Sequence, residues 1–355
     1  MDKYRIGGHK LMYHVTRVNR WLEHGDVYPV YMEISPSGTC NHRCTFCALD
    51  FMGYRRRFLD TGVLMERLTE MGALGLKSVM YGGEGEPFLH RDMVRIINHT
   101  KRSSIDVAVT TNGVFFTQET AEKTLADIEW IKISLNAGTP DTYARVHGTH
   151  REDFNRVIGN IAAAAEIKRK GGYGCTIGVQ MLLLPENFHE AVTLARTVRE
   201  AGADYLVVKP YSQHPSSVTR QYEAVKYSQY MHLAEELSSE GGEDFNVIFR
   251  TGAMQKWDDA GRGYHRCLAH PFWSYMDAGG NIWGCSVYLG DERFRYGNIY
   301  EETFMQIWEG PTRRKIAGWI EKELDVSKCR VNCRMDAVNE YLWELKHPPA
   351  HVNFI

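Results

Sequence analysis

The sequence predicts an α/β fold, in which an open, partial (β/α)6 TIM-like barrel is followed by a small C-terminal α+β domain. From Val30 to Lys209, short apolar runs alternate with amphipathic segments, which is typical of parallel strands covered by helices. From about Gly241 the pattern changes to short strands, turns and a few helices. Six strand–helix units are too few to close an eight-stranded barrel, so we expect an open one.

The predicted barrel occupies residues 30–240, after an N-terminal helical segment, residues 1–29, with a helix at His9–Glu23. Its predicted strands are Tyr31–Ile34, Ser78–Tyr81, Asp106–Thr110, Trp130–Leu135, Thr176–Leu184 and Tyr205–Lys209. Its predicted helices are Leu64–Gly72, Met93–Thr100, Thr117–Ala126, Arg151–Lys170, Phe188–Ala201 and Tyr222–Ser239. The carboxyl ends of such strands carry the chemistry, so we expect the site at that end.

The predicted second domain, residues 241–355, begins with a turn-rich hairpin. Its strands are Phe272–Met276 and Asn281–Cys285, and its helices are Phe304–Trp308, Arg313–Glu323 and a last helix that ends near Leu345.

Composition excludes several classes of protein. The 355 residues carry a net charge of −2, so nothing favours a nucleic-acid partner. No run reaches the roughly 18 apolar residues of a membrane span, and the N-terminus lacks the apolar core of a signal peptide. We therefore expect a cytoplasmic protein without a membrane partner. In that compartment, clustered cysteines more often bind metals or catalyse reactions than form disulfides.

Cys40, Cys44 and Cys47 form a Cys-x3-Cys-x2-Cys array directly after the first predicted strand. Thiols this close can face one iron–sulfur core, and three local ligands leave one iron of a four-iron cluster open. The alternatives are three buried cysteines or a zinc site, for which His42 is the only further ligand inside the array.

This array, with Phe46 before its last thiol, resembles that of the radical S-adenosylmethionine (radical SAM) enzymes. The resemblance implies a [4Fe–4S] cluster whose open iron is chelated by S-adenosylmethionine, and reductive cleavage of that cofactor to a 5′-deoxyadenosyl radical. It also implies cofactor contacts at Phe46, Gly82, Gly83, Glu84, Asn112, Ser134, Arg145, Gln180 and Leu184. Taken singly, the glycines also fit a tight turn and the polar residues also fit satisfied groups inside the barrel.

The C-terminal cysteines follow the pattern Cys267-x17-Cys285-x43-Cys329-x3-Cys333. This pattern resembles the twitch domain, a shortened SPASM domain, and implies a second [4Fe–4S] cluster with every iron ligated by protein. A zinc site of four cysteines is the alternative.

The layout resembles twitch-containing 2-deoxy-scyllo-inosamine dehydrogenases most and twitch-containing sugar epimerases next. The resemblance therefore implies a radical SAM oxidoreductase or epimerase that takes hydrogen from a hydroxyl-bearing carbon of a small sugar or aminocyclitol. It also implies an electron donor such as flavodoxin or ferredoxin. Two alternatives remain. One is a peptide-modifying maturase with a separate leader-binding partner, since only a short segment precedes Cys40; the other is a sensor or electron carrier that does not cleave the cofactor.

Candidate substrate residues follow the sixth predicted strand. Lys209, Tyr211 and His214 suit a polar, hydroxyl-rich or anionic substrate, and His214 either carries a proton or caps a loop before Pro215. Cys175 could return a hydrogen atom in an epimerase. It lies at the start of the fifth predicted strand, far from the expected site, which favours a small buried hydrophobic residue.

Overall fold

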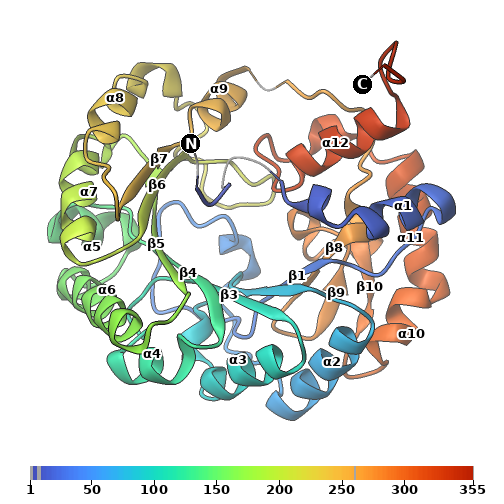
Figure 1. Ribbon diagram of the computed structural model, residues 1–355, viewed down its shortest axis with the longest axis horizontal. Coiled ribbons are helices and arrows are strands. Elements are labelled where there is room, and N and C mark those ends of the chain that lie inside the picture. Colours follow the sequence, from blue (N-terminus) through green and yellow to red (C-terminus); the bar gives the residue numbers. More distant parts are fainter. Residues whose placement is uncertain (1–2, 6–8, 260, 355) are drawn as a thin grey trace.

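The protein is built on one curved, open sheet with helices around its outside (Figure 1). The computed structural model describes residues 3–5, 9–259 and 261–354. Within these residues, ten strands pair in the order β10-β9-β8-β1-β2-β3-β4-β5-β6-β7. The strands are β1 Tyr31–Ile34, β2 Ser78–Tyr81, β3 Asp106–Thr111, β4 Ile128–Ser134, β5 Thr176–Leu183, β6 Tyr205–Pro210, β7 Asn246–Phe249, β8 Trp273–Met276, β9 Asn281–Trp283 and β10 Arg295–Asn298.

Helices alternate with the barrel strands, as the sequence predicts. The α-helices are α1 Val15–His24, α2 Thr61–Ala73, α3 Met93–Arg102, α4 Gln118–Thr124, α5 Pro140–His147, α6 Glu152–Gly171, α7 Ala191–Glu200, α8 Leu233–Ser238, α9 Thr251–Asp259, α10 Phe304–Glu309, α11 Pro311–Lys322 and α12 Asp336–Lys346. Short 3-10 helices are η1 Leu11–Tyr13, η2 Asp50–Met52, η3 Pro87–Leu89, η4 Phe188–Glu190, η5 Tyr227–Tyr230, η6 His270–Phe272, η7 Ser286–Tyr288, η8 Glu292–Phe294 and η9 Val326–Lys328. None of the described helices is long and apolar enough to cross a membrane.

The two faces of the sheet differ in chemistry. In β4, the fully buried Ile131 and Ile133 alternate with the half-buried Trp130, Lys132 and Ser134. The isoleucines belong to the large core under the outer helices. The alternate residues therefore face the concave side, where Figure 1 also shows the blue segment that follows β1.

The partial barrel is confirmed, and the sheet extends beyond the six predicted strands at both ends. β7 pairs in parallel with β6, and β8 pairs in parallel with β1. The boundary predicted at residue 240 therefore cuts a continuous sheet. The C-terminal hairpin of β8 and β9 is antiparallel, as expected, and it extends the barrel sheet rather than forming a separate one.

Helix predictions differ from the structure in several places, and α9 was not predicted. Residues 221–224 are a turn and residues 225–226 are irregular, so the predicted helix Tyr222–Ser239 is reduced to η5 and α8. Helix α5 was not predicted, although Thr139 caps its N-terminus, Pro140 is its first residue and Gly148 ends it with φ 57°. This combination is a recognisable helix signature.

Candidate functional site

The cysteine loop follows β1 and is held by the end of α5. The backbone N–H groups of Arg43 and Thr45 donate to the carbonyls of His147 and Val146, at 3.0 and 2.9 Å. Gly148 permits this approach, because a Cβ atom there would lie 2.3 Å from the carbonyl oxygen of Arg43. The C-terminal carbonyls of α5 therefore shape the loop that carries Cys44.

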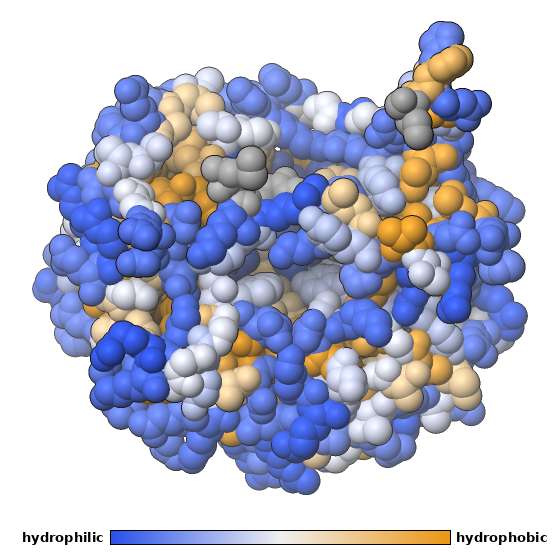
Figure 2. All heavy atoms as spheres, viewed as in Figure 1, coloured by the Kyte–Doolittle hydropathy of each residue, from blue (hydrophilic) through white to orange (hydrophobic). Residues whose placement is uncertain are grey.

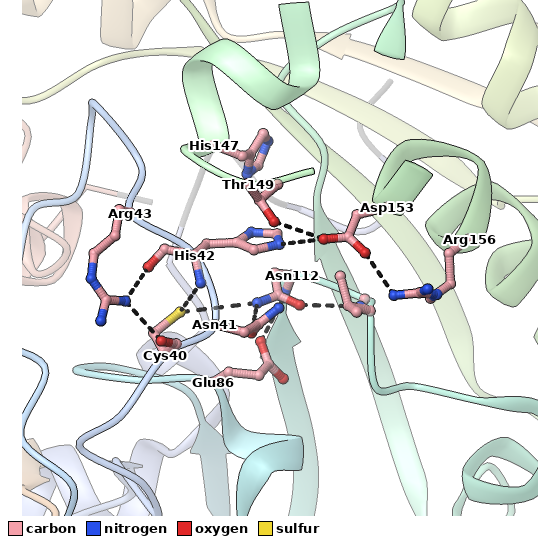
Figure 3. Close-up of polar contacts among 12 residues, drawn as sticks. Cys40, Asn41, His42, Arg43, Glu86, Asn112, His147, Thr149, Asp153 and Arg156 are labelled. Atoms are coloured by element: carbon pink, nitrogen blue, oxygen red, sulfur yellow. Dashed lines mark hydrogen bonds and ion pairs between the residues drawn. The ribbon is translucent and has the colours of Figure 1, made fainter. Parts of the chain in front are cut away.

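The three thiols are partly accessible, and none of the eight cysteines of the described chain forms a disulfide. The backbone N–H of His42 points at Cys40 Sγ, at 3.5 Å (Figure 3). Burial, and next the charge of Glu86, raises the pKa of the Cys40 thiol to about 12. Burial likewise raises the pKa values of Cys44 and Cys47. A metal that binds here must therefore displace protons.

Glu86 and Asn112 connect β2 and β3 to the cysteine loop (Figure 3). Glu86 is buried and accepts hydrogen bonds from the Thr111 hydroxyl and the Asn112 backbone N–H, at 2.6 and 2.8 Å. The Asn112 side chain donates to Asn41 Oδ1 at 2.8 Å, and its Nδ2 lies 4.0 Å from Cys40 Sγ. Asn112 therefore contacts the cysteine loop, and its role as a cofactor contact stays a prediction.

His147 contacts the cysteine loop through a ring nitrogen whose proton can be assigned. Its Nε2 faces two donors, the backbone N–H of Asn136 at 3.0 Å and the Asn136 amide at 3.3 Å. Burial lowers the pKa of His147 well below its usual range, so the ring is neutral. Nε2 must then be the acceptor and Nδ1 must carry the proton. Nδ1 lies 3.6 Å from Cys44 Sγ, so His147 donates to that sulfur.

This tautomer rules out His147 as a metal ligand. Ligand atoms of His42, Cys44 and His147 lie within 4.8 Å of one another, close enough to suggest a metal site. A protonated Nδ1 has no lone pair to offer, so His147 does not ligate, and the alternative zinc site consists of the three thiols and His42. The set of three thiols with hydrogen-bond donors to sulfur fits an iron–sulfur cluster.

Glu84 lies away from the cysteine loop. Its buried carboxylate forms an ion pair with Arg57 at 2.7 Å and accepts the backbone N–H of Ala278 at 2.8 Å. Gly83, at φ 106°, has no room for a side chain, because a Cβ would lie 2.1 Å from the Tyr275 hydroxyl. Gly82 has ordinary space around it. The sequence predicts Glu84 as the cofactor contact, whereas Glu86 is the glutamate next to the cysteine loop. The Gly-Glu pair occurs twice, at residues 83–84 and 85–86, so the sequence does not distinguish the two glutamates.

The remaining predicted cofactor residues divide into accessible and buried ones. Ser134 and Gln180 are paired in register on β4 and β5. Arg145 is exposed on α5 and donates to the Thr142 hydroxyl at 3.1 Å. Phe46 packs edge-on against the His147 ring, with centroids 5.3 Å apart. Leu184 is fully buried, so its side chain belongs to the core and has no exposed surface for a cofactor.

All four C-terminal cysteines line one cavity, which is otherwise mostly apolar. Each sulfur also has a donor near it. Val287 N–H lies 3.5 Å from Cys285, Met335 N–H 3.4 Å from Cys333, Tyr288 Oη 3.3 Å from Cys329 and Asn339 Nδ2 3.9 Å from Cys267. Four convergent thiols with such donors fit a cluster with every iron ligated.

The predicted substrate residues have different surroundings. Lys209 lies near the end of β6, and its ammonium forms no hydrogen bond or ion pair with the described residues. Tyr211 is buried, donates its N–H to the Tyr227 hydroxyl at 2.6 Å and its hydroxyl to Gln213 at 3.0 Å. Tyr211 is therefore already engaged in the fold.

His214 is a loop cap. Its Nδ1 accepts the Ser216 N–H at 3.1 Å, so Nε2 carries the proton toward the Ser286 carbonyl at 3.4 Å. The ring stacks on Phe51, and burial lowers its pKa to about 4. His214 is therefore neutral, and both of its ring nitrogens have hydrogen-bond partners. This corrects its prediction as a proton carrier and supports the loop cap.

Cys175 lies just before β5, at the amino-terminal end of the barrel. It is 2% exposed, and burial raises its pKa to about 12. The structure thus argues against Cys175 as a hydrogen donor. It supports the alternative, in which Cys175 is a small buried hydrophobic residue.

An iron–sulfur loop on an open α/β barrel, beside a four-cysteine cavity, defines a radical SAM architecture, and comparison with known proteins agrees. Residues 34–198 match the Radical SAM superfamily, and residues 267–334 match the SPASM iron–sulfur cluster-binding domain. The chain contains a radical SAM domain followed by a SPASM domain. Such a chain carries [4Fe–4S] clusters and S-adenosylmethionine as cofactors.

Curated relatives include a GTP 3′,8-cyclase of Limosilactobacillus fermentum, 31% identical over 39% of this chain and 43% of that protein. A probable GTP 3′,8-cyclase of Saccharolobus solfataricus is 33% identical over 38% of this chain and 44% of that protein. The chain thus matches less than half the length of these relatives.

Among solved structures, Streptococcus suis SuiB bound to the precursor peptide SuiA is similar with a TM-score of 0.65 and 19% identity, over 86% of this chain and 71% of that one. An anSMEcpe structure with bound AdoMet is similar with a TM-score of 0.56 and 16% identity, over 81% of this chain and 82% of that one. These likenesses show the fold. The narrower resemblance to aminocyclitol dehydrogenases and sugar epimerases stays a prediction.

Proposed function

We propose that this protein is a radical SAM oxidoreductase or epimerase. Its substrate is a small polar metabolite of the sugar or aminocyclitol type, from which hydrogen is taken at a hydroxyl-bearing carbon. The observation that carries the proposal is the pairing of two unlike thiol sites on one sheet: three thiols after β1, and four thiols around the hairpin whose β8 pairs with β1. An incomplete site accepts a cofactor, whereas a complete one suits electron transfer.

The seven cysteines of the two thiol sites would hold two clusters with different roles. Cys40, Cys44 and Cys47 would hold the first cluster, and the four cysteines of the cavity would hold the second. When bound, the first cluster and S-adenosylmethionine supply a 5′-deoxyadenosyl radical, with electrons from a donor such as flavodoxin or ferredoxin. Asn112 and His147 fix the sulfur environment of the loop.

The concave face of the sheet would position the substrate. The half-buried Ser134 and the buried Gln180 are paired in register there and would hold the cofactor beside it. Glu84 forms an ion pair with Arg57 and accepts the Ala278 N–H, which joins the segment after β2 to the C-terminal region. Exclusion of water by a bound substrate would protect a reactive radical from side reactions.

The relatives' names suggest other substrates. GTP 3′,8-cyclases are named for a nucleotide, and SuiB was solved with a precursor peptide. The nucleotide relatives match only part of this chain, and the likeness to SuiB is one of fold. Both substrate classes are therefore outcomes that the experiment distinguishes.

The experiment is anaerobic reconstitution followed by reduction with S-adenosylmethionine present. About eight irons per chain and formation of 5′-deoxyadenosine are expected. Candidate hydroxylated metabolites are then incubated in deuterium oxide: an epimerase incorporates solvent deuterium into its product, whereas an oxidation yields a ketone. Absence of cofactor cleavage by a fully loaded protein would refute the proposal. Turnover of a peptide or a nucleotide instead would replace its substrate class.

Cys175→Ala provides an internal control for the epimerase outcome. Because Cys175 lies at the far end of the barrel, we expect unchanged deuterium incorporation in this variant. Loss of incorporation would restore Cys175 as the hydrogen donor.

A further inference from the structure

The concave face of the sheet carries an excess of positive charge. Lys132 on β4 and Lys209 on β6 are half-buried there, and Arg250 directly follows β7. Arg330 and Arg334 belong to the Cys329–Arg334 segment of the SPASM domain. All five cations interact electrostatically, because each of the other four contributes to lowering the pKa of Lys209, after burial itself.

Only part of this charge is compensated within the described residues. Glu33 on β1 is buried and forms an ion pair with Arg334, which also donates to the Tyr31 hydroxyl at 2.9 Å. Arg330 binds neutral oxygens, the hydroxyl and the carbonyl of Ser212, at 2.8 and 2.6 Å. Among Lys132, Lys209, Arg330 and Arg334, Arg334 is therefore the one that forms an ion pair with a carboxylate of the described residues.

The two lysines have no carboxylate partner among the residues that the structure describes. The Lys132 ammonium lies 5.2 Å from the centre of the Trp130 ring, an attraction weaker than an ion pair. Burial, and next Arg334 and Arg250, lowers the pKa of Lys132 to about 8. Uncompensated cations brought together inside a protein cost free energy, which an anionic ligand would recover.

The charges surround open space rather than packed core. The Arg334 side chain keeps 47% of its surface accessible although its partner Glu33 lies on an inner strand. Figure 2 shows this face of the molecule hollowed near its centre. The hollow lies inside the arc of the sheet, where the barrel substrate would bind (Figure 1).

We propose that Lys132, Lys209 and Arg330 bind an anionic group of the substrate, a phosphate or a carboxylate, inside the barrel. The identification of the anion as part of the substrate rests on the proposed function. Binding of an anion at these cations does not depend on catalysis. The SPASM segment thus supplies specificity as well as cluster ligands, because Arg330 directly follows Cys329.

The test uses the anaerobically reconstituted full chain and small anions as probes. Sodium phosphate and sodium succinate are compared with sodium chloride at equal ionic strength, by thermal unfolding and by calorimetric titration. We expect phosphate, succinate or both to raise the Tm and to bind, since a ligand of the native state stabilises it. Which of the two binds identifies the chemical source of the negative charge.

Variants connect that binding to the two lysines. In Lys132→Met and Lys209→Met, we expect a higher Tm in chloride, because repulsion is relieved. We also expect anion affinity to fall at least about tenfold. Lys315→Met on the exposed face of α11 is the matched control and should change neither. A lysine that only stabilised the fold would instead lower the Tm in chloride when replaced.

Three results would overturn the proposal: no anion binding beyond chloride, equal binding by the variants and the wild type, or competition between S-adenosylmethionine and the anion, which would assign these cations to the cofactor. Cofactor cleavage is measured separately. A failure of the anion site and a failure of the proposed radical chemistry are therefore distinguishable.

Discussion

The two thiol sites are assembled in opposite ways. The first takes three cysteines from one eight-residue loop, and the second gathers cysteines from separate segments spanning residues 267–333. Both sites combine backbone N–H donors two residues after a cysteine with side-chain donors from elsewhere, but the side-chain donors of the first come from the barrel, Asn112 after β3 and His147 on α5, and Asn339 at the second comes from its own domain.

The difference shows what each site is suited to do. A loop that supplies only three ligands leaves a position for a cofactor, and the surrounding elements can tune it without ligating. A cavity closed by four ligands is fixed by the packing of its own domain. Changes in α5 or after β3 should therefore affect only the first site, which makes the comparison testable.

Loss of a ligand should have the largest effect. In Cys44→Ala, we expect about four of about eight irons to be lost and formation of 5′-deoxyadenosine to stop. In Cys329→Ala, about four irons should also be lost, but the first site should still cleave the cofactor. Iron analysis and product chromatography measure both. If Cys329→Ala abolished cleavage as completely as Cys44→Ala, the two sites would not be independent.

Removal of a donor to sulfur should come next. His147→Leu removes the Nδ1 donor to Cys44, and we expect about 10- to 100-fold lower activity or metal affinity. The reduction potential and the electron paramagnetic resonance signal of the first cluster should shift. Asn339→Leu is the counterpart at Cys267 and should shift only the second signal. A shift of both signals in either variant would contradict the separation of the sites.

The two buried glutamates give a third comparison. Glu86→Gln loses a carboxylate that accepts from Thr111, Asn112 and Phe88, and we expect a cost of about 1–3 kcal/mol in the free energy of unfolding, with weaker S-adenosylmethionine binding. Glu84→Gln should destabilise the junction with the C-terminal region and leave cofactor affinity unchanged, because Glu84 pairs with Arg57. Denaturant unfolding and calorimetry separate the two. Equal loss of cofactor affinity in both variants would return Glu84 to the site.

The smallest effect concerns His214, which joins the two regions through Phe51 and Ser286. Its pKa of about 4 in the folded protein lies below the usual 6.5, so the unfolded chain takes up the proton first as the pH falls. Its contribution to stability is complete above about pH 6.5 and is lost toward pH 4. At pH 5.5 the loss is about 1.4 kcal/mol.

His214→Gln should lack this part of the pH dependence. Unfolding curves of the wild type and the variant between pH 7.5 and 5.5 isolate it, because the other buried histidines are common to both. Parallel curves would mean that His214 is charged or exposed in the native state.

The sequence predicted what depends on local pattern. Strands such as Ser78–Tyr81 were placed correctly because apolar runs mark them, and the loop at Cys40 was recognised from its spacing. The errors depend on three-dimensional context. Glu84 and Glu86 are chemically identical and two residues apart, and only the fold decides which one faces the loop. Leu184 has the periodicity of a strand end, but burial removes it from the concave face.

His147 and Arg330 were missed for a related reason. Each acts through a neighbour that is remote in sequence, Cys44 for His147 and Ser212 for Arg330. His147 lies at the end of helix α5, which was not predicted although Thr139, Pro140 and Gly148 mark that helix.

The pairing of β8 with β1 has a consequence for engineering. A chain cut before residue 273 would leave the N–H and C=O groups of Tyr31–Ile34 without partners on one side. Such an uncovered inner strand templates pairing with other molecules and promotes aggregation. Exchange of SPASM domains between enzymes of this architecture should therefore transfer strands β8 to β10 together with the β1 strand that pairs with β8. Truncated forms should be tested for solubility before they are tested for activity.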